Sequence, residues 1–295
     1  MFEHAWVEPA ASGAPDAPEP PLRPLLHLLD EAVDRWPARP AIEFMGKLIS
    51  YRELGALVSH AATGLQQLGV GPGVRVALHL PVTPHVAIAF FAVLKAGGTL
   101  VDCLALEGVP ALRDALDASR SEVLITLAAP RWYEPTHCPI HAAYLRCVVV
   151  GTLAQFAAHP DAVIAAQRRD GAYVDVPLDG RHVRFGQLLR NDGRCRTLTP
   201  GPADHAVALL RSNADGSALE SLTHAALGKA CRQRTDGSHR HDVPTGGEVP
   251  TRVPLPLGDA RTLIADMLLC VQLGALQLLG ADGRLVLNRM AAQQN

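Results

Sequence analysis

The sequence predicts an α/β fold made of βαβ units with a mostly parallel sheet. Three apolar, strand-like runs lie at 74–80, 99–103 and 122–126, and helix-like stretches separate them. Thr83 and Pro84 are typical of the N-cap and first position of a helix, and Gly97 ends that helix. Strands that alternate with helices in this way form right-handed crossovers and parallel pairs.

Further elements are predicted on both sides of these units. Ser50 with Glu53 is a capping-box pattern, and the apolar residues from Leu54 to Leu68 recur at helical spacing behind it. The other expected elements are a helix at 25–36, a hairpin at 41–51 with Gly46 in its turn, a helix from Pro110 to about Ser119, strands at 147–150 and 205–210, a helix at 261–279 and a strand at 283–288. Long connections are expected at 130–145 and 159–204, and an exposed loop at 234–250.

Composition excludes several classes of protein. The chain has 295 residues, a formal net charge of −2 and only 4% aromatic residues, which argues against a nucleic-acid partner. Its six cysteines form no CxxC pair, so we expect reduced thiols and a cytoplasmic protein. The most apolar late run, 264–279, is short for a membrane span and contains Asp266, so no transmembrane segment is predicted.

A long collinear stretch carries a family resemblance. ISYREL at 49–54, the run from Leu65 to Cys103 that includes VLKAGGTLVDC, and LRDALDASRSEVLIT at 112–126 resemble the AMP-dependent synthetase/ligase family of adenylate-forming acyl-CoA synthetases. HVRFGQLLRNDG at 182–193 resembles the long-chain fatty acid–CoA ligases of that family. The resemblance implies a truncated N-terminal domain of the adenylate-forming fold.

The resemblance also implies a division of the chain and its ligands. Residues 25–290 would be a partial AMP-binding domain, flanked by a disordered Pro/Ala-rich tail at 1–24 and a short tail at 291–295. Family members are about twice as long, and their adenine, ribose and magnesium segments and catalytic lysine would lie beyond Asn295. Family ligands are ATP with magnesium, CoA and an acyl group.

The segment that aligns with the family's phosphate-binding loop is altered. That loop resembles Y-T-x-G-T-T-G-x-P-K-G followed by Thr-His, and here the stretch is LLRSNADGSALESLTH at 209–224. Its lysine position falls on Ala218, and glycine positions hold Arg211 or Ser212, Asp215 and Leu219. The candidate cofactor-binding positions are Arg211, Ser212, Asp215, Gly216, Thr223 and His224. The changes predict that ATP is not bound tightly. The preferred interpretation is an ordinary strand-to-helix loop with His224 in a structural role, and the alternative is a retained loop that binds ATP.

Two weaker candidates lie near the C-terminal end. Asp259 occupies the histidine position of the family's L-P-L-x-H segment, where the acyl pocket is expected, although a solvated turn explains it equally well. His239 and His241 could bind a metal with His137, Cys138 or Asp242. A solvated loop is the preferred interpretation, so no metal site and no catalytic residue is assigned.

Three hypotheses of function follow. The first is a non-catalytic relative of the acyl-CoA synthetases, a binding or scaffolding subunit of acyl or lipid metabolism. It would associate with a protein partner or a second copy through an apolar face on the sheet and on the 261–279 helix. The second is one half of a split fatty acid–CoA ligase, which would be an acid–thiol ligase only with a partner chain. The third is a decayed fragment without function.

Overall fold

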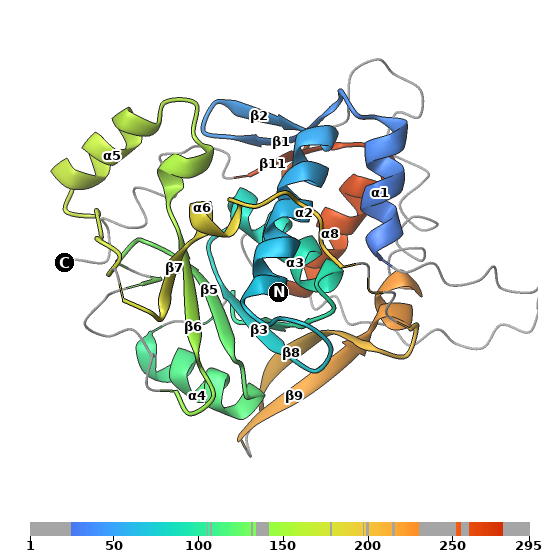
Figure 1. Cartoon of the computed structure of the whole chain (residues 1–295), viewed down its shortest axis with the longest axis vertical. Helices are drawn as coiled ribbons and strands as arrows, with labels where there is room; N and C mark the ends of the chain where they lie inside the picture. Colours follow the sequence, from blue (N-terminus) through green and yellow to red (C-terminus); the bar gives the residue numbers. More distant parts are fainter. Residues whose placement is uncertain are drawn as a thin grey trace, which may run out of the picture.

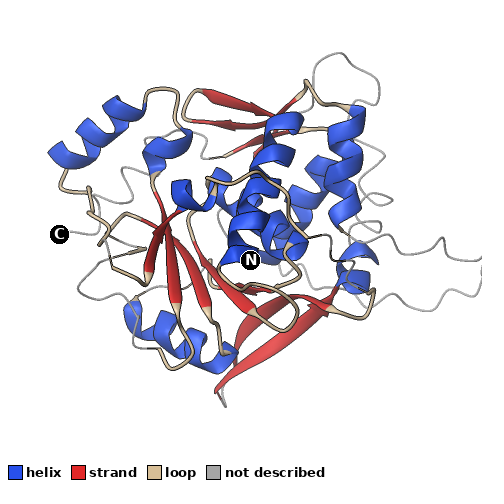
Figure 2. Ribbon diagram, viewed as in Figure 1, coloured by secondary structure: helices blue, strands red, loops and turns tan. Residues whose placement is uncertain are grey.

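Two β-sheets enclose a layer of helices, and one further helix covers the outer face of the larger sheet (Figures 1 and 2). This computed structural model describes residues 25–104, 106, 108–130, 132–133, 142–177, 179–196, 198, 201–213, 216–229, 252–254 and 260–279. The enclosed helices and the two facing sheet surfaces share one apolar core. A second, smaller apolar cluster lies on the opposite face of the larger sheet.

The larger sheet has seven strands in the order β7-β6-β5-β3-β4-β8-β9. They are β3 (Arg75–His79), β4 (Thr99–Asp102), β5 (Val123–Leu127), β6 (Cys147–Gly151), β7 (His182–Arg184), β8 (His205–Asn213) and β9 (Gly216–Thr223). All neighbours pair in parallel except β8 and β9. The predicted α/β class with a mostly parallel sheet is therefore confirmed, and β5 and β6 are buried at every position, as central parallel strands require.

The helices differ in how much of their surface is buried, and this difference explains their different apolar patterns. In α2 (Tyr51–Gln67), Ser50 Oγ accepts from the Glu53 N–H at 3.2 Å, and the Ser50 N–H donates to the Glu53 carboxylate at 2.7 Å, so the predicted capping box is present. Helix α3 (Pro84–Lys95) is buried from Pro84 to Leu94 on every side. A helix that is apolar all round must lie inside a core, and α3 lies between the sheets. Helices α1 (Leu26–Arg35) and α4 (Val109–Ser119) match their predicted positions.

The smaller sheet joins the two ends of the described chain. Its order is β10-β11-β1-β2, with strands β1 (Pro40–Phe44), β2 (Lys47–Ser50), β10 (Arg252–Pro254) and β11 (Leu276–Leu278). The predicted hairpin between β1 and β2 turns at Met45 and Gly46, both at positive φ. Strand β11 pairs in parallel with β1, and Tyr51 Oη lies 2.8 Å from the Ala275 carbonyl oxygen. Residues more than two hundred positions apart thus form one unit.

The prediction of a continuous helix at 261–279 was wrong at its C-terminal end. Helix α8 (Ala260–Leu273) stops before Gly274, whose φ is +64°, and β11 follows. A Cβ at Gly274 would lie 2.5 Å from the Trp36 ring, so close packing against α1's end requires glycine there. The apolar run continues because β11 is buried in the smaller sheet, and its apolar character alone does not distinguish strand from helix.

The long connection predicted at 159–204 was also wrong. This segment contains α5 (Pro160–Arg169), β7 and α6 (Phe185–Leu188), and a 3-10 turn, η1 (Leu153–Phe156), precedes it. Each element is short, and α5 buries only Val163 and Gln167. Their sequences therefore carry too little apolar periodicity to stand out from polar loop sequence.

Several expectations lie outside the described residues. These are the tails at 1–24 and 291–295, the loop at 234–250, the strand at 283–288, Asp215, Asp259 and the metal candidates His137, Cys138, His239, His241 and Asp242. Within the described residues, no helix has the length and apolarity needed to cross a membrane.

The expected apolar face on α8 is not observed. Leu263, Ile264, Met267 and Leu268 of this helix are at most 4% exposed, and α1 packs against it. In the part of the chain that the structure describes, Leu48 and Tyr144 are the exposed large apolar side chains. The surface therefore offers isolated apolar residues rather than a broad patch.

The side chain of Gln277 gives a stability prediction. This residue of β11 is 0% exposed, and neither amide atom finds a hydrogen-bond partner in the described structure. Because a buried unpaired amide costs about 1–3 kcal/mol, Gln277→Met should raise the free energy of unfolding by about 1–2 kcal/mol in urea titrations.

A matched substitution serves as the control. Gln66 donates to the Arg196 carbonyl at 3.0 Å and accepts from the Arg196 N–H at 2.8 Å, so Gln66→Met should lower stability. A fall in stability for Gln277→Met as well would mean that its amide is paired.

Candidate functional site

The segment aligned with a phosphate-binding loop is a β-hairpin. Arg211 pairs with Ala218, Ser212 with Ser217 and Asn213 with Gly216, so the antiparallel ladder runs almost to the tip. Only positions 214 and 215 lie between the last paired residues. The preferred interpretation of an ordinary strand-to-helix loop was therefore wrong, because the polar residues that suggested a loop continue two paired strands.

Thr223 and His224 lie where β9 meets a helical turn at 224–229. Thr223 Oγ1 accepts from the Ala226 N–H at 3.1 Å, as an N-cap residue does. His224 is 4% exposed, and its backbone N–H donates to the backbone carbonyl of Asp204 at 3.0 Å. Burial lowers the pKa of His224, and the nearby Asp204 carboxylate opposes this effect. Both residues therefore have local structural contacts at this junction.

The structure separates the predicted site residues into two groups. Arg211, Ser212 and Gly216 lie near the tip of the hairpin, whereas Thr223 and His224 lie at its base. Strand β9 runs from Gly216 to Thr223, and a strand rises about 3.3 Å per residue, which separates the groups by about 20 Å. One compact ligand cannot contact both groups directly.

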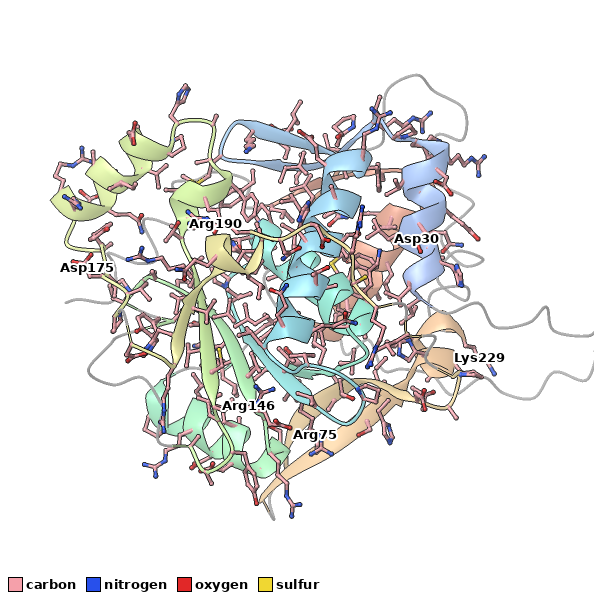
Figure 3. All side chains as sticks on the ribbon, viewed as in Figure 1. Asp30, Arg75, Arg146, Asp175, Arg190 and Lys229 are labelled. Carbon is pink, nitrogen blue, oxygen red and sulfur yellow. The ribbon has the colours of Figure 1, made fainter. Side chains whose placement is uncertain are left out.

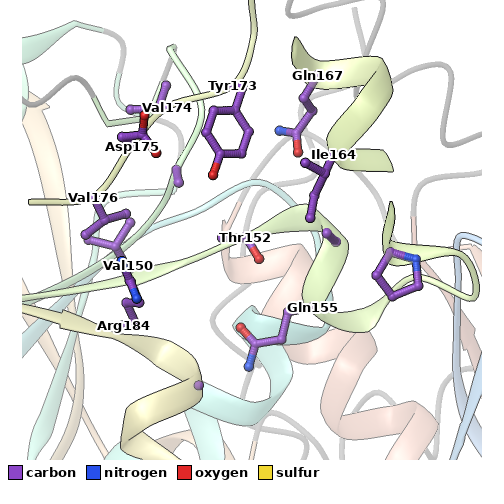
Figure 4. A pocket seen from close by; sticks show the side chains of 14 residues that line it. Val150, Thr152, Gln155, Ile164, Gln167, Tyr173, Val174, Asp175, Val176 and Arg184 are labelled. Atoms are coloured by element: carbon purple, nitrogen blue, oxygen red, sulfur yellow. The ribbon is translucent and has the colours of Figure 1, made fainter. Parts of the chain in front are cut away.

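A pocket lies at the opposite side of the larger sheet, where β5, β6 and β7 end. Its volume is about 540 Å³, within the range typical of small-molecule sites. Ala128 follows β5, Thr152 follows β6 and Arg184 ends β7, while Ile164 and Gln167 project from α5 (Figure 4). In sheets of this kind, ligands bind at the carboxyl ends of the strands. Sequence reasoning missed this pocket because most of its lining comes from the segment interpreted as connections.

A buried histidine supports one wall of the pocket. His85 of α3 is 0% exposed, and its Nδ1 lies 3.2 Å from Thr83 Oγ1. Its Nε2 lies 3.4 Å from Oε1 of Gln155, which lines the pocket. Burial lowers the pKa of His85 to about 4, although Gln155 opposes the shift. The ring is therefore neutral at physiological pH, and it contacts the Gln155 side chain from the buried side of the pocket wall.

The packing around His85 is tight. Its ring meets Phe156 and Phe185 edge to face, with centroids 4.8 and 4.9 Å away. A Cβ at Gly151, the last residue of β6, would lie 2.6 Å from the imidazole ring. Glycine at this strand end thus allows the imidazole ring of His85 to approach the sheet closely. The rings of Phe156 and Phe185 pack against the imidazole and restrict its orientation.

The charged residues labelled in Figure 3 are spread over the chain: Arg75 begins β3, Arg146 precedes β6 and Asp175 lies in the connection after α5. The Arg146 guanidinium pairs with Glu122 at 3.0 Å.

Comparisons with known proteins agree on a single family. Residues 29–203, more than half of the chain, match the family model for AMP-binding enzymes. The salicyl-AMP ligase / salicyl-S-ArCP synthetase of Mycobacterium tuberculosis is 41% identical over 87 residues, which cover 28% of this chain and 15% of that protein. The long-chain-fatty-acid–CoA ligase of Bacillus subtilis is 30% identical over 122 residues, covering 41% and 22%.

Solved structures give the same fold over more of the chain. The apo structure of MbtA from Mycobacterium smegmatis has a TM-score of 0.65 at 20% identity and covers 92% of this chain and 46% of that one. A coronafacic acid ligase from Pectobacterium brasiliense has a TM-score of 0.66 at 15% identity, with coverage of 92% and 48%. The chain thus spans about half the length of these structures and a smaller share of the curated relatives.

The buried His85 predicts a pH dependence of stability. Its folded pKa of about 4 lies below the usual 6.5, so below pH 6.5 the unfolded chain binds a proton that the folded chain does not. The contribution of the neutral His85 to the free energy of unfolding is therefore fully present above pH 6.5 and is lost as the pH falls toward 4. Between about pH 7 and pH 5 this histidine should remove about 2 kcal/mol.

Urea unfolding at both pH values would measure this loss. In His85→Gln the corresponding loss should disappear, even though the variant starts from lower stability at pH 7. An equal pH dependence in the wild type and the variant would contradict the assignment.

Proposed function

The chain belongs to the AMP-binding enzyme family, and we propose that it is a non-catalytic member, a binding or scaffolding subunit in acyl metabolism. In this proposal it does not form an acyl-adenylate by itself. Membership alone does not decide activity, because function depends on the site rather than on the fold. The proposal therefore depends on the segment where a nucleotide would be held.

The paired hairpin is the observation that carries the proposal. A phosphate cradle needs several backbone N–H groups that converge on one anion. Residues 211–213 and 216–218 instead form regular antiparallel pairs, which leaves positions 214 and 215 between the strands. The residues present at this position do not fit ATP phosphates.

The charge of this segment in the sequence supports the same proposal. Asp215 falls at a glycine position of the family's loop, and Ala218 falls at its lysine position. A carboxylate about 4 Å from a phosphate oxygen costs about 4 kcal/mol at an effective dielectric near 20. That energy corresponds to about three orders of magnitude in affinity.

The second candidate is half of a ligase that a separate chain completes. Membership of the AMP-binding enzyme family favours it, because the relatives that the chain matches include ligases. Under this alternative, the two chains together would bind ATP and form an acyl-adenylate. The hairpin would then have to bind phosphate in the assembled protein.

Calorimetric titration with magnesium-ATP and with AMP tests the nucleotide part of the proposal. The folded wild-type chain should give no saturable heat at about millimolar ligand. The variant Asp215→Asn/Ala218→Lys should gain measurable affinity, because it removes the repulsion and adds a cation. The control Asp161→Asn removes a carboxylate from α5, far from the hairpin in sequence, and should give no binding heat with magnesium-ATP or AMP. Submillimolar binding by the wild type would favour the ligase alternative.

Sedimentation velocity over a range of concentrations tests the association part. Strand β2 is an edge strand of the smaller sheet, and its Leu48 is 55% exposed, so self-association should use this edge. Leu48→Lys should lower the sedimentation coefficient at high concentration, whereas Tyr144→Lys, which changes the other exposed large apolar residue of the described chain, should not. A wild-type chain that stays monomeric throughout would exclude a homodimer.

A further inference from the structure

The pocket at the ends of β5, β6 and β7 has walls suited to an apolar ring. Val150, Ile164, Val174 and Val176 face its volume of about 540 Å³. These side chains come from the sheet, from α5 and from the segment that follows α5, so three parts of the fold enclose the space. A pocket of this size and composition is typical of small-molecule sites.

Uncharged polar groups converge within these walls. Thr152, Gln155, Gln167 and Tyr173 place two hydroxyl and two amide groups around the centre of the pocket (Figure 4). Gln167 is only 3% exposed, and its side chain lines the pocket. An amide at a pocket wall is stabilised when a ligand or a water molecule supplies a hydrogen-bond partner. Its complement is a group with one donor and one acceptor, such as another amide.

Three contacts hold this part of the pocket in place before any ligand binds. The guanidinium of Arg168 stacks over the Tyr173 ring at 4.5 Å, and the backbone N–H of Tyr173 donates to the backbone carbonyl of Gln167 at 3.0 Å. On the other side, the buried His85 lies 3.4 Å from Gln155 Oε1. Preorganised groups lose less entropy on binding, which favours affinity for a small ligand.

The charges at the pocket rim oppose each other. Arg184 and Asp175 both line the pocket, and both are exposed. Solvent screens such charges, and their opposite signs give no net attraction for an ion. The apolar walls, the Gln167 amide and this balance of charge together favour an uncharged ligand.

We propose that this pocket is a binding site for a small, uncharged aromatic amide. The ring would lie against the valine and isoleucine side chains, and the amide would exchange hydrogen bonds with Gln167 and Gln155. This site is separate from the hairpin at the nucleotide-loop position, and it would remain even if the chain formed adenylates.

Ligand-observed NMR and calorimetry of the whole chain test the proposal with two probes of similar shape. Benzamide is the uncharged amide, and benzoate is the anion that replaces it. Benzamide should bind with a dissociation constant of about 1 mM or tighter, and benzoate about tenfold more weakly, since it cannot donate to the Gln amides. Tighter binding of benzoate would overturn the proposal.

Three variants locate the binding. Gln167→Met should weaken benzamide binding about tenfold, which is the loss expected for one hydrogen-bonded pair. Ile164→Trp should abolish binding by filling the pocket. Gln277→Met makes the same change as the first variant outside the pocket, and should leave the affinity unchanged.

Circular dichroism and thermal melting would confirm that each variant is folded. If Ile164→Trp does not fold, amide chemical-shift changes at Thr152 and Gln155 in the wild type provide the second readout. Unchanged benzamide affinity in Gln167→Met, or shift changes confined to residues outside the pocket, would overturn the proposal.

Discussion

The fold depends on the burial of α3 on all sides. Its residues from Pro84 to Leu94 have no face that can tolerate water, so the helix requires apolar surface from two directions. The larger sheet supplies one surface through β3 and β4, and α2 with α1 supplies the other. The smaller sheet forms only when β11 returns to pair with β1, and Tyr51 Oη fixes that junction at the Ala275 carbonyl. The buried helix and the strands that join both ends of the described chain thus share one apolar core.

This arrangement also determines where ligands can bind. The parallel strands of the larger sheet all end at one edge, but α3 and the smaller sheet fill the space over one of its faces. The pocket forms beside this core, where η1 and α5 extend beyond β6. His85 links the two regions, because it belongs to the buried helix and contacts Gln155 of the pocket. A side chain of the core therefore takes part in shaping the pocket.

The relation to AMP-binding enzymes is strongest in the elements that build the core. The matched residues 29–203 include α2, α3, α4 and strands β3 to β7. The hairpin of β8 and β9 lies outside the match, and its ladder continues to positions 213 and 216. The core and the hairpin are under different physical constraints, because the core needs apolar periodicity, whereas the hairpin is held by paired backbone groups.

The sequence by itself determined the local elements and the parallel βαβ order. The Ser50–Glu53 capping box, the Gly46 turn and the strands at 74–80 and 99–103 were all predictable, because each depends on neighbouring residues. Only the tertiary structure decided β11, β9, α5 and the pocket. A three-residue strand such as β11 exists because a partner from the other end of the chain supplies its hydrogen bonds. The pocket likewise depends on α5 and on strand ends brought together by packing, which no local pattern of residues encodes.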